Sequence, residues 1–328
     1  MQIGIVGLPN VGKSTLFNSL TKARAVVADY PFTTIVPNVG IVSVPDDRLK
    51  KLGSIYWPEK LTPTTIKFVD IAGLVKGASK GEGLGNKFLS HIREMDAIVQ
   101  VLDCFREGNN PKDEIKIIKT ELFLVDLEVL NKKISSVSPR AKCGIKEAKE
   151  ELEILYKIKS EIEMGHKSQL EVADITLLSS IPVIYIANVK EFLNFSISKF
   201  GNLEIVPINA KLEMELLELS DEEKKELGVQ SELDKLILAS YKLLDLITFY
   251  TTVGVEIRAW NIKKGTSAQK AAGKIHTDFE KNFIRAEVFN FSELEKYGTE
   301  KILHDKGLVR IEGKEYIVRD GDILRIKI

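Results

Sequence analysis

The chain has 328 residues, of which 44% are hydrophobic and 29% charged, and its 47 basic residues balance 47 acidic ones. This length predicts two or three domains of a globular protein. A formal net charge of zero excludes attraction to nucleic acid by the field of the whole molecule, so such binding needs a local patch. The two cysteines, Cys104 and Cys143, cannot form a disulfide framework. No apolar run reaches membrane-spanning length and a strand pattern begins at once, so we expect a cytoplasmic protein without signal peptide or membrane partner.

A phosphate-binding pattern lies near the start of the chain. Residues 7–15 read GLPNVGKST and fit G-x-x-x-x-G-K-[ST], with a strand expected at 2–6 and a helix beginning near Ser14. Such a loop turns backbone N–H groups toward phosphate oxygens, and the helix N-terminus adds positive potential. We predict that Lys13 reaches the β- and γ-phosphates and that the Ser14 hydroxyl binds Mg²⁺; the alternative is an ordinary glycine-rich turn. The nucleotide contacts predicted in this loop are Asn10, Val11, Gly12, Lys13, Ser14 and Thr15.

Strand and helix patterns alternate through much of the chain. Apolar runs of strand length follow at 40–44, 66–71, 97–103, 183–188 and 204–209, and helical patterns lie around 87–95, 221–227 and 231–246. This alternation predicts an α/β fold, with a mostly parallel sheet covered by helices on both faces.

A helical segment interrupts this alternation. Apolar residues recur at spacings of three and four over 115–129 and again over 148–162, with Pro139 and Gly144 between the two runs. The spacing predicts two antiparallel amphipathic helices, a short coiled-coil hairpin. From about residue 247 a strand at 255–260, a helix at 267–275, an extended segment at 284–288 and a hairpin over 315–326 predict a small α+β domain. The predicted domains are 1–111 with 181–246 for the nucleotide, 112–180 for the helical insertion and 247–328 for the C-terminal domain.

A second phosphate-site motif, D-x-x-G, ends the strand at 66–71. In a P-loop protein its aspartate, here Asp70, holds Mg²⁺ through water, and the N–H of its glycine, here Gly73, can sense the γ-phosphate. A hydroxyl from Thr33 or Thr34 in the preceding loop can complete the Mg²⁺ shell, and we favour Thr34. The predicted catalytic residues are therefore Lys13, Thr34 and Gly73, and the predicted metal ligands are Ser14, Thr34 and Asp70.

The residues after the strand at 183–188 bear on the choice of base. Guanine-specific proteins carry N-K-x-D there, whereas this chain has Asn188, Val189, Lys190 and Glu191. The guanine N2 donor loses its usual aspartate, while the Asn188 amide can donate to and accept from the N6/N7 edge of adenine. This favours ATP over GTP; a degenerate guanine motif that still prefers GTP is the alternative. The predicted base contacts are Asn188, Val189, Glu191, Asn209, Ala210 and Lys211.

The sequence offers no clear catalytic side chain. Leu74 follows D-x-x-G, where GTPases often place the glutamine that orients the attacking water, so we expect slow hydrolysis assisted by another residue, a cation or a partner. The side-chain oxygen of Asn10 can help to hold K⁺ between phosphates, or Asn10 simply tolerates an awkward loop conformation.

Taken together, these motifs resemble the Obg-like ATPase (YchF) family of P-loop NTPases. The resemblance is carried by GLPNVGKST (7–15), YPFTTI (30–35), DIAGLV (70–75), GEGLGN (81–86), NVKE (188–191), AGKIHTDFE (272–280) and FIRAEV (283–288). It implies a three-layer, Ras-like domain that prefers ATP, a coiled-coil insertion, and a C-terminal TGS domain of β-grasp fold associated with RNA or ribosome contact. The chain departs from the family in an insertion that looks short and in a loop, 105–110, that lacks a histidine found in many bacterial members.

The function expected from the sequence is a switch that binds ATP, slowly hydrolyses it to ADP and phosphate, and changes its affinity for the ribosome or another RNA-containing partner. The alternatives are a GTPase of the Obg class, or a non-catalytic ribosome-binding module with structural nucleotide. Cations in the C-terminal domain permit contact with RNA phosphates, with no DNA specificity expected. They are Lys263, Lys264, Lys270, Lys274, Lys281 and Arg285.

Overall fold

The computed structural model describes residues 1–23, 39–71, 84–192, 200 and 203–328. Backbone contacts divide the chain into two compact units, one formed by 1–40 with 67–236 and the other by 41–66 with 237–328. The segment 41–66, which the sequence places with the nucleotide-binding residues, thus groups with the C-terminal part of the chain.

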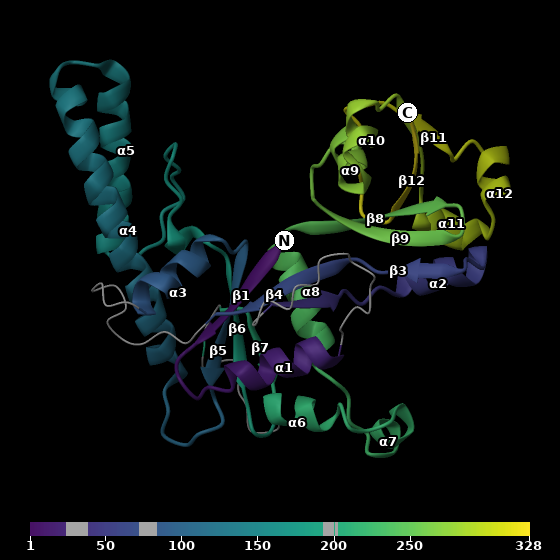
Figure 1. The fold of residues 1–328 in the computed structure, drawn as a ribbon, viewed down its shortest axis with the longest axis horizontal. Helices are drawn as coiled ribbons and strands as arrows, with labels where there is room; N and C mark the ends of the chain where they lie inside the picture. Colours follow the sequence, from purple (N-terminus) through teal and green to yellow (C-terminus); the bar gives the residue numbers. More distant parts are fainter. Residues whose placement is uncertain (24–38, 72–83, 193–199, 201–202) are drawn as a thin grey trace. The chain divides into compact units, whose positions relative to one another are not determined.

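A six-stranded sheet of order β2-β4-β1-β5-β6-β7 has most of its residues in the first unit (Figure 1). Its strands are β1 (Gln2–Gly7), β2 (Val39–Ser43), β4 (Thr65–Asp70), β5 (Ala97–Asp103), β6 (Val183–Asn188) and β7 (Ile205–Ile208). The pairs β1–β4, β1–β5, β5–β6 and β6–β7 are parallel. All seven residues of β5 are buried, as expected for a central strand that is covered on both faces. The predicted α/β fold is confirmed.

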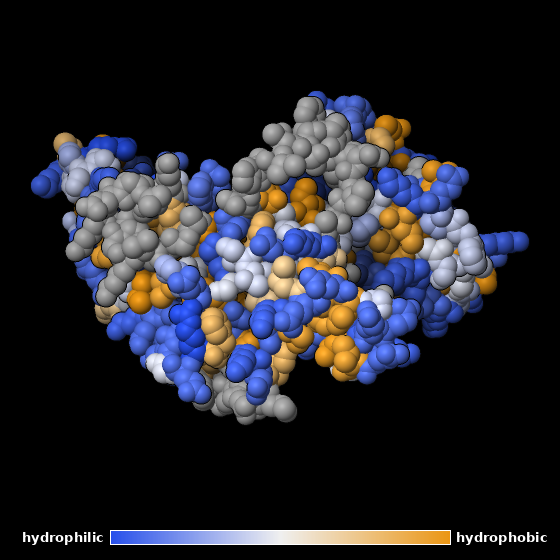
Figure 2. Space-filling model, turned by 60° about the horizontal axis from the view of Figure 1, so that its bottom comes forward, coloured by the Kyte–Doolittle hydropathy of each residue, from blue (hydrophilic) through white to orange (hydrophobic). Residues whose placement is uncertain are grey.

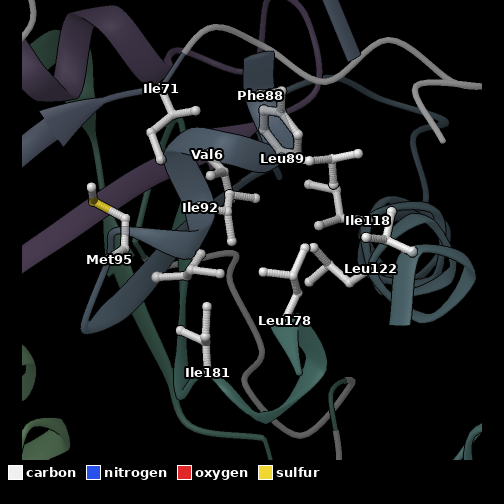
Figure 3. Packing of buried hydrophobic residues seen from close by; sticks show 12 residues of the cluster. Val6, Ile71, Phe88, Leu89, Ile92, Met95, Ile118, Leu122, Leu178 and Ile181 are labelled. Atoms are coloured by element: carbon white, nitrogen blue, oxygen red, sulfur yellow. The ribbon is translucent and has the colours of Figure 1, made fainter. Parts of the chain in front are cut away.

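Helices separate the strands of this sheet along the chain and follow its last strand. They are α1 (Lys13–Ala23), α3 (Leu84–Arg93), α4 (Pro111–Lys142), α5 (Lys146–Glu163), the 3₁₀ helix η2 (Leu178–Ser180), α6 (Ala210–Glu215), α7 (Asp221–Glu226) and α8 (Leu233–Leu243). One buried cluster joins Val6 of β1 to Phe88 and Ile92 of α3 and to Ile118 and Leu122 of α4 (Figure 3). The base of α4 is therefore part of the core that supports the sheet.

Helices α4 and α5 form a hairpin that projects away from the sheet of the same unit (Figure 1). A seam of buried residues that includes Leu130, Ile134 and Leu155 holds the two helices together. Pro139 lies inside α4, which continues to Lys142, so the turn is made by residues 143–145. Gly144 occupies this turn with a φ of 90°, a backbone conformation that glycine adopts without strain.

The second unit has its own six-stranded sheet, of order β11-β10-β12-β8-β9-β3. Its strands are β3 (Lys60–Thr62), β8 (Leu246–Val253), β9 (Glu256–Lys263), β10 (Arg285–Asn290), β11 (Arg310–Glu312) and β12 (Asp322–Lys327). Its helices are α2 (Asp47–Tyr56), α9 (Ala268–Ile275), α10 (Thr277–Lys281), α11 (Phe291–Tyr297) and α12 (Glu300–Asp305). Leu49 and Leu52 of α2 pack against Tyr250 and Ile323 of this sheet, which is why the segment 41–66 groups with this unit.

The hairpin predicted over 315–326 is wrong. Residues 315–318 form no strand beyond an isolated bridge between Ile317 and Ser267, and β12 pairs instead with β10 and β8. The reason is that Asp322, which ends the expected turn, is fully buried and accepts hydrogen bonds from Tyr316 and from the backbone N–H of Arg319.

In the part of the chain that the structure describes, no helix is both long and apolar enough to cross a membrane. Figure 2 shows one face of the molecule, on which hydrophilic residues separate scattered hydrophobic patches.

Candidate nucleotide-binding site

The predicted phosphate-binding loop connects β1 to α1, as the motif requires. Gly12 has a φ of 91°, and a Cβ atom built on it would lie 2.2 Å from the Asn188 Nδ2 atom. Glycine is therefore needed at this position for both its backbone angle and its small size. Asn10 adopts a φ of 65°, an uncommon angle for a residue with a side chain.

Three residues of the predicted phosphate and metal site meet at the end of β4. The Lys13 ammonium group donates to one carboxylate oxygen of Asp70, and the Ser14 hydroxyl lies 3.3 Å from the other. The side chains of Lys13 and Asp70 are only 12% and 13% exposed. The carboxylate and hydroxyl oxygens of Asp70 and Ser14 are the hard ligands that Mg²⁺ prefers, so this donor set fits the ion.

Asn188, at the end of β6, joins the phosphate-binding loop to the N-terminus of α6. Its side-chain Nδ2 donates to the carbonyl oxygen of Val11 at 2.9 Å, and its Oδ1 accepts from the N–H of Ala210 at 3.1 Å. The side chain is buried, with 7% of its surface exposed. The amide that the sequence assigns to base recognition thus also joins the phosphate-binding loop to the N-terminus of α6.

The other predicted base contacts lie in different environments. Val189 packs in a buried cluster with Leu102 and Phe200, and its N–H donates to the carbonyl of Ile208, so its side chain faces the core. Asn209 caps α6 through the N–H of Leu212 and donates to the carbonyl of Lys190. Thr15, Glu191 and Lys211 have exposed side chains. Thr34 and Gly73 lie outside the described residues.

Sequence reasoning did not single out Arg106, which reaches the phosphate-binding loop from the end of β5. Its guanidinium group donates to the carbonyl oxygen of Asn10 and lies 3.1 Å from the Asp103 carboxylate. Asp103 is almost fully buried and also accepts from the backbone N–H groups of Phe105 and Arg106. Arg106 therefore connects a buried carboxylate to the loop residue with the uncommon backbone angle. An aspartate at a strand end with an arginine three residues later was the available signal.

Glu114 in turn holds the backbone of Asp103 and the loop that carries Arg106. Glu114, near the start of α4, accepts from the N–H of Asp103 at 3.2 Å and from the Asn109 side chain at 2.6 Å. Burial raises the pKa of the Glu114 carboxyl above its usual value. The loop at 105–110 is thus held by hydrogen bonds on the side that faces α4.

We expect Arg106→Gln to weaken nucleotide binding about five-fold, because about 1 kcal/mol of charge-assisted hydrogen bonding to the loop is lost at this half-exposed site. KM should rise while kcat changes little, since Arg106 acts through the loop. Titration with a fluorescent ATP analogue and steady-state kinetics measure the two quantities. Arg106→Lys keeps the charge near Asp103 and should restore part of the affinity. Unchanged affinity in the glutamine variant would contradict this role.

The fold and this site define a P-loop nucleoside-triphosphate-binding protein. Residues 2–137 match a family described as a 50S ribosome-binding GTPase. Residues 246–328 match the family YchF-GTPase_C, which is described as a protein of unknown function.

Similar proteins cover nearly the whole chain, which belongs to the YchF family. "Ribosome-binding ATPase YchF" of Bacillus subtilis (strain 168) is 48% identical over an alignment of 358 residues, covering 99% of this chain and 98% of the relative. The protein of the same name in Escherichia coli O157:H7 is 46% identical, with 98% and 97% covered. The solved Schizosaccharomyces pombe YchF GTPase has a TM-score of 0.88 and 35% identity, with 100% of this chain and 97% of the other covered. The alignment with the Bacillus relative is longer than this chain, so that relative has residues that this chain lacks.

Proposed function

We propose that this chain is an ATPase that binds the ribosome, with the bound nucleotide controlling that association. The observation that carries the proposal is the meeting of Lys13 and Ser14 at the Asp70 carboxylate beside the phosphate-binding loop. The names of the bacterial relatives support ATP as the nucleotide and the ribosome as the partner. ADP and phosphate are the products.

In the proposed mechanism, residues of the chain neutralise the charge of the phosphates and hold the nucleotide in place. The Lys13 ammonium group, here paired with Asp70, moves to the β- and γ-phosphates and offsets their charge as water attacks. Ser14, Asp70 and Thr34 would hold Mg²⁺, which when bound neutralises phosphate charge. The N–H of Gly73 would face the γ-phosphate, and the Asn10 side chain would contribute to holding K⁺. Leu74 cannot orient water, so hydrolysis is slow until a partner assists.

The buried position of Val189 supports adenine as the base. The proteins that read guanine carry lysine at this position of N-K-x-D, whereas the Val189 side chain packs in the core. The Asn188 side chain donates one N–H to Val11 and accepts one hydrogen bond from Ala210. One N–H and one oxygen lone pair of the amide remain for the base. The remaining contacts with the base would come from Glu191 and from residues 209–211 at the N-terminus of α6, with Val189 contributing only through its backbone.

We expect the purified chain to bind ATP at least ten-fold more tightly than GTP. The physical reason is that no aspartate stands at position 191 to accept from guanine N1 and N2. Competition against a fluorescent nucleotide measures both affinities. Glu191→Asp restores the shorter carboxylate and should narrow the preference. Tighter binding of GTP by the unchanged protein would overturn the assignment to ATP and favour a GTPase. The names of the matching N-terminal family and of the Schizosaccharomyces pombe relative both contain the word GTPase.

We also propose that three parts of the chain act as domains: 1–111 with 181–246 as a nucleotide-binding domain, 112–180 as a coiled-coil insertion and 247–328 as a TGS domain that contacts RNA. The segment 41–66 is the exception, because its contacts group it with the C-terminal part. What supports RNA contact is a set of six exposed cations around β9, α9, α10 and β10. They are Lys263, Lys264, Lys270, Lys274, Lys281 and Arg285. Phosphate contacts of this kind carry no sequence preference, so DNA specificity is not expected.

A further inference from the structure

The end of the helical hairpin carries a concentration of positive charge in a chain whose formal net charge is zero. We define the hairpin tip as residues 131–149, which comprise the last turns of α4, the connecting turn and the first turn of α5. Its only acidic residue is Glu147. Its basic residues are Lys132, Lys133, Arg140, Lys142, Lys146 and Lys149.

Most of these cations are not neutralised within the hairpin. Lys133 pairs with Glu151 at 3.1 Å, and Lys146 lies 3.9 Å from Glu150, a long and highly exposed pair. Among the described residues, the remaining four cations have no ion-pair partner, and all four are exposed. They are Lys132, Arg140, Lys142 and Lys149. The tip therefore presents a positive surface to solvent.

Helix stability accounts for only part of this charge. Arg140 and Lys142 lie in the last turn of α4, where cations interact favourably with the helix dipole. Lys146 and Lys149 lie in the first turn of α5, where each cation costs up to about 1 kcal/mol and acidic residues are preferred. The residue that caps α5, Ile145, supplies no side-chain hydrogen bond. Local stability thus opposes the lysines of α5, which points to a role outside folding.

Most apolar side chains of the tip are buried inside the hairpin. Ile134, Val137, Ala141 and Ala148 are buried in the seam between the two helices. Ile145, which is 39% exposed, is the large apolar side chain left on the described surface of the tip. A cationic surface with little apolar area suits a phosphate backbone better than an apolar groove on a protein.

We propose that the hairpin tip binds the phosphate backbone of ribosomal RNA. This inference rests on the proposed ribosome binding and assigns part of that contact to Arg140, Lys142, Lys146 and Lys149. Helix α4 has 32 residues, so at about 1.5 Å per residue it spans about 48 Å and carries the tip well away from the nucleotide-binding loop. The contact positions the protein and reads no sequence.

The test compares two triple variants of the full chain. Arg140→Gln with Lys142→Gln and Lys149→Gln removes charge at the tip. Lys112→Gln with Lys116→Gln and Lys157→Gln removes equal charge from exposed positions of the same helices away from the tip. Binding to purified ribosomes is measured by sedimentation over a series of salt concentrations, and ATP turnover is measured without ribosomes.

We expect the tip variant to bind ribosomes at least ten-fold more weakly than the control variant. The slope of log affinity against log salt should fall by about two to three, roughly one for each lost phosphate contact. ATP turnover without ribosomes should match the control. Equal ribosome binding by the two variants would overturn the role of the tip and leave the proposed function intact. Failure of the unchanged protein to bind ribosomes would overturn both.

Cys143 provides a test of the partner's chemistry, because it is exposed in the turn of the tip. A photoactivated crosslinker attached to Cys143 should label ribosomal RNA when the protein is bound to ribosomes. Cys143→Ser, treated in the same way, is the control and should give no product at this position. Crosslinks to ribosomal protein alone would overturn the assignment to RNA.

Discussion

Lys13→Ala is expected to lower kcat for ATP by about two to three orders of magnitude, the usual effect of removing one preorganised charge from a reacting group. In the structure Lys13 donates to Asp70 beside the phosphate-binding loop, and no other lysine or arginine among the described residues pairs with that carboxylate. Turnover is measured by phosphate release with purified protein. The nucleotide dependence of ribosome binding should disappear in the same variant.

Lys22→Ala is the matched control for this variant, because Lys22 lies in the last turn of the same helix and is exposed. It should leave turnover unchanged. Thermal unfolding of both variants separates a lost catalytic charge from a lost fold. If Lys13→Ala kept normal ATP turnover and nucleotide-dependent ribosome binding, the proposed mechanism would be wrong.

Asn188→Ala is expected to lower the free energy of unfolding by about 2–4 kcal/mol, because it leaves two buried backbone groups without their partners. These groups are the carbonyl of Val11 and the N–H of Ala210. Nucleotide affinity should fall at least ten-fold, since the phosphate-binding loop and the N-terminus of α6 are no longer joined. Denaturant titration and fluorescent-nucleotide binding measure the two effects.

Asn188→Asp separates the two contacts of this side chain. A carboxylate still accepts from the N–H of Ala210 but repels the carbonyl oxygen of Val11, so the phosphate-binding loop alone should be disturbed. Asn18→Ala, at an exposed position of α1, is the control and should change stability by less than about 0.5 kcal/mol. Wild-type stability and affinity in Asn188→Ala would contradict the joining role.

The elements of the first sheet could be predicted because their signals are local. β1, β5 and β6 are short apolar runs, and α4 and α5 have an apolar residue at every third or fourth position. The second unit was predicted less well. Helix α2 was missed although Leu49, Leu52 and Tyr56 recur at helical spacing after the capping residue Asp46, and β3 has only three residues. Residues 315–318 resemble a strand, but their backbone follows the hydrogen bonds of Asp322 instead.

Motif spacing and apolar periodicity act over a few residues, so the phosphate-binding loop, Asp70 and the α/β class could be recognised without the structure. The contact of Arg106 with the Asn10 carbonyl, 96 residues away, and the joining of the phosphate-binding loop to α6 by Asn188 arise only when the chain is folded. Folding also buries Val189 in the core and brings 41–66 to the C-terminal residues. These features depend on which distant segments meet when the sheets form, and side-chain partners across such distances leave no local pattern in the chain.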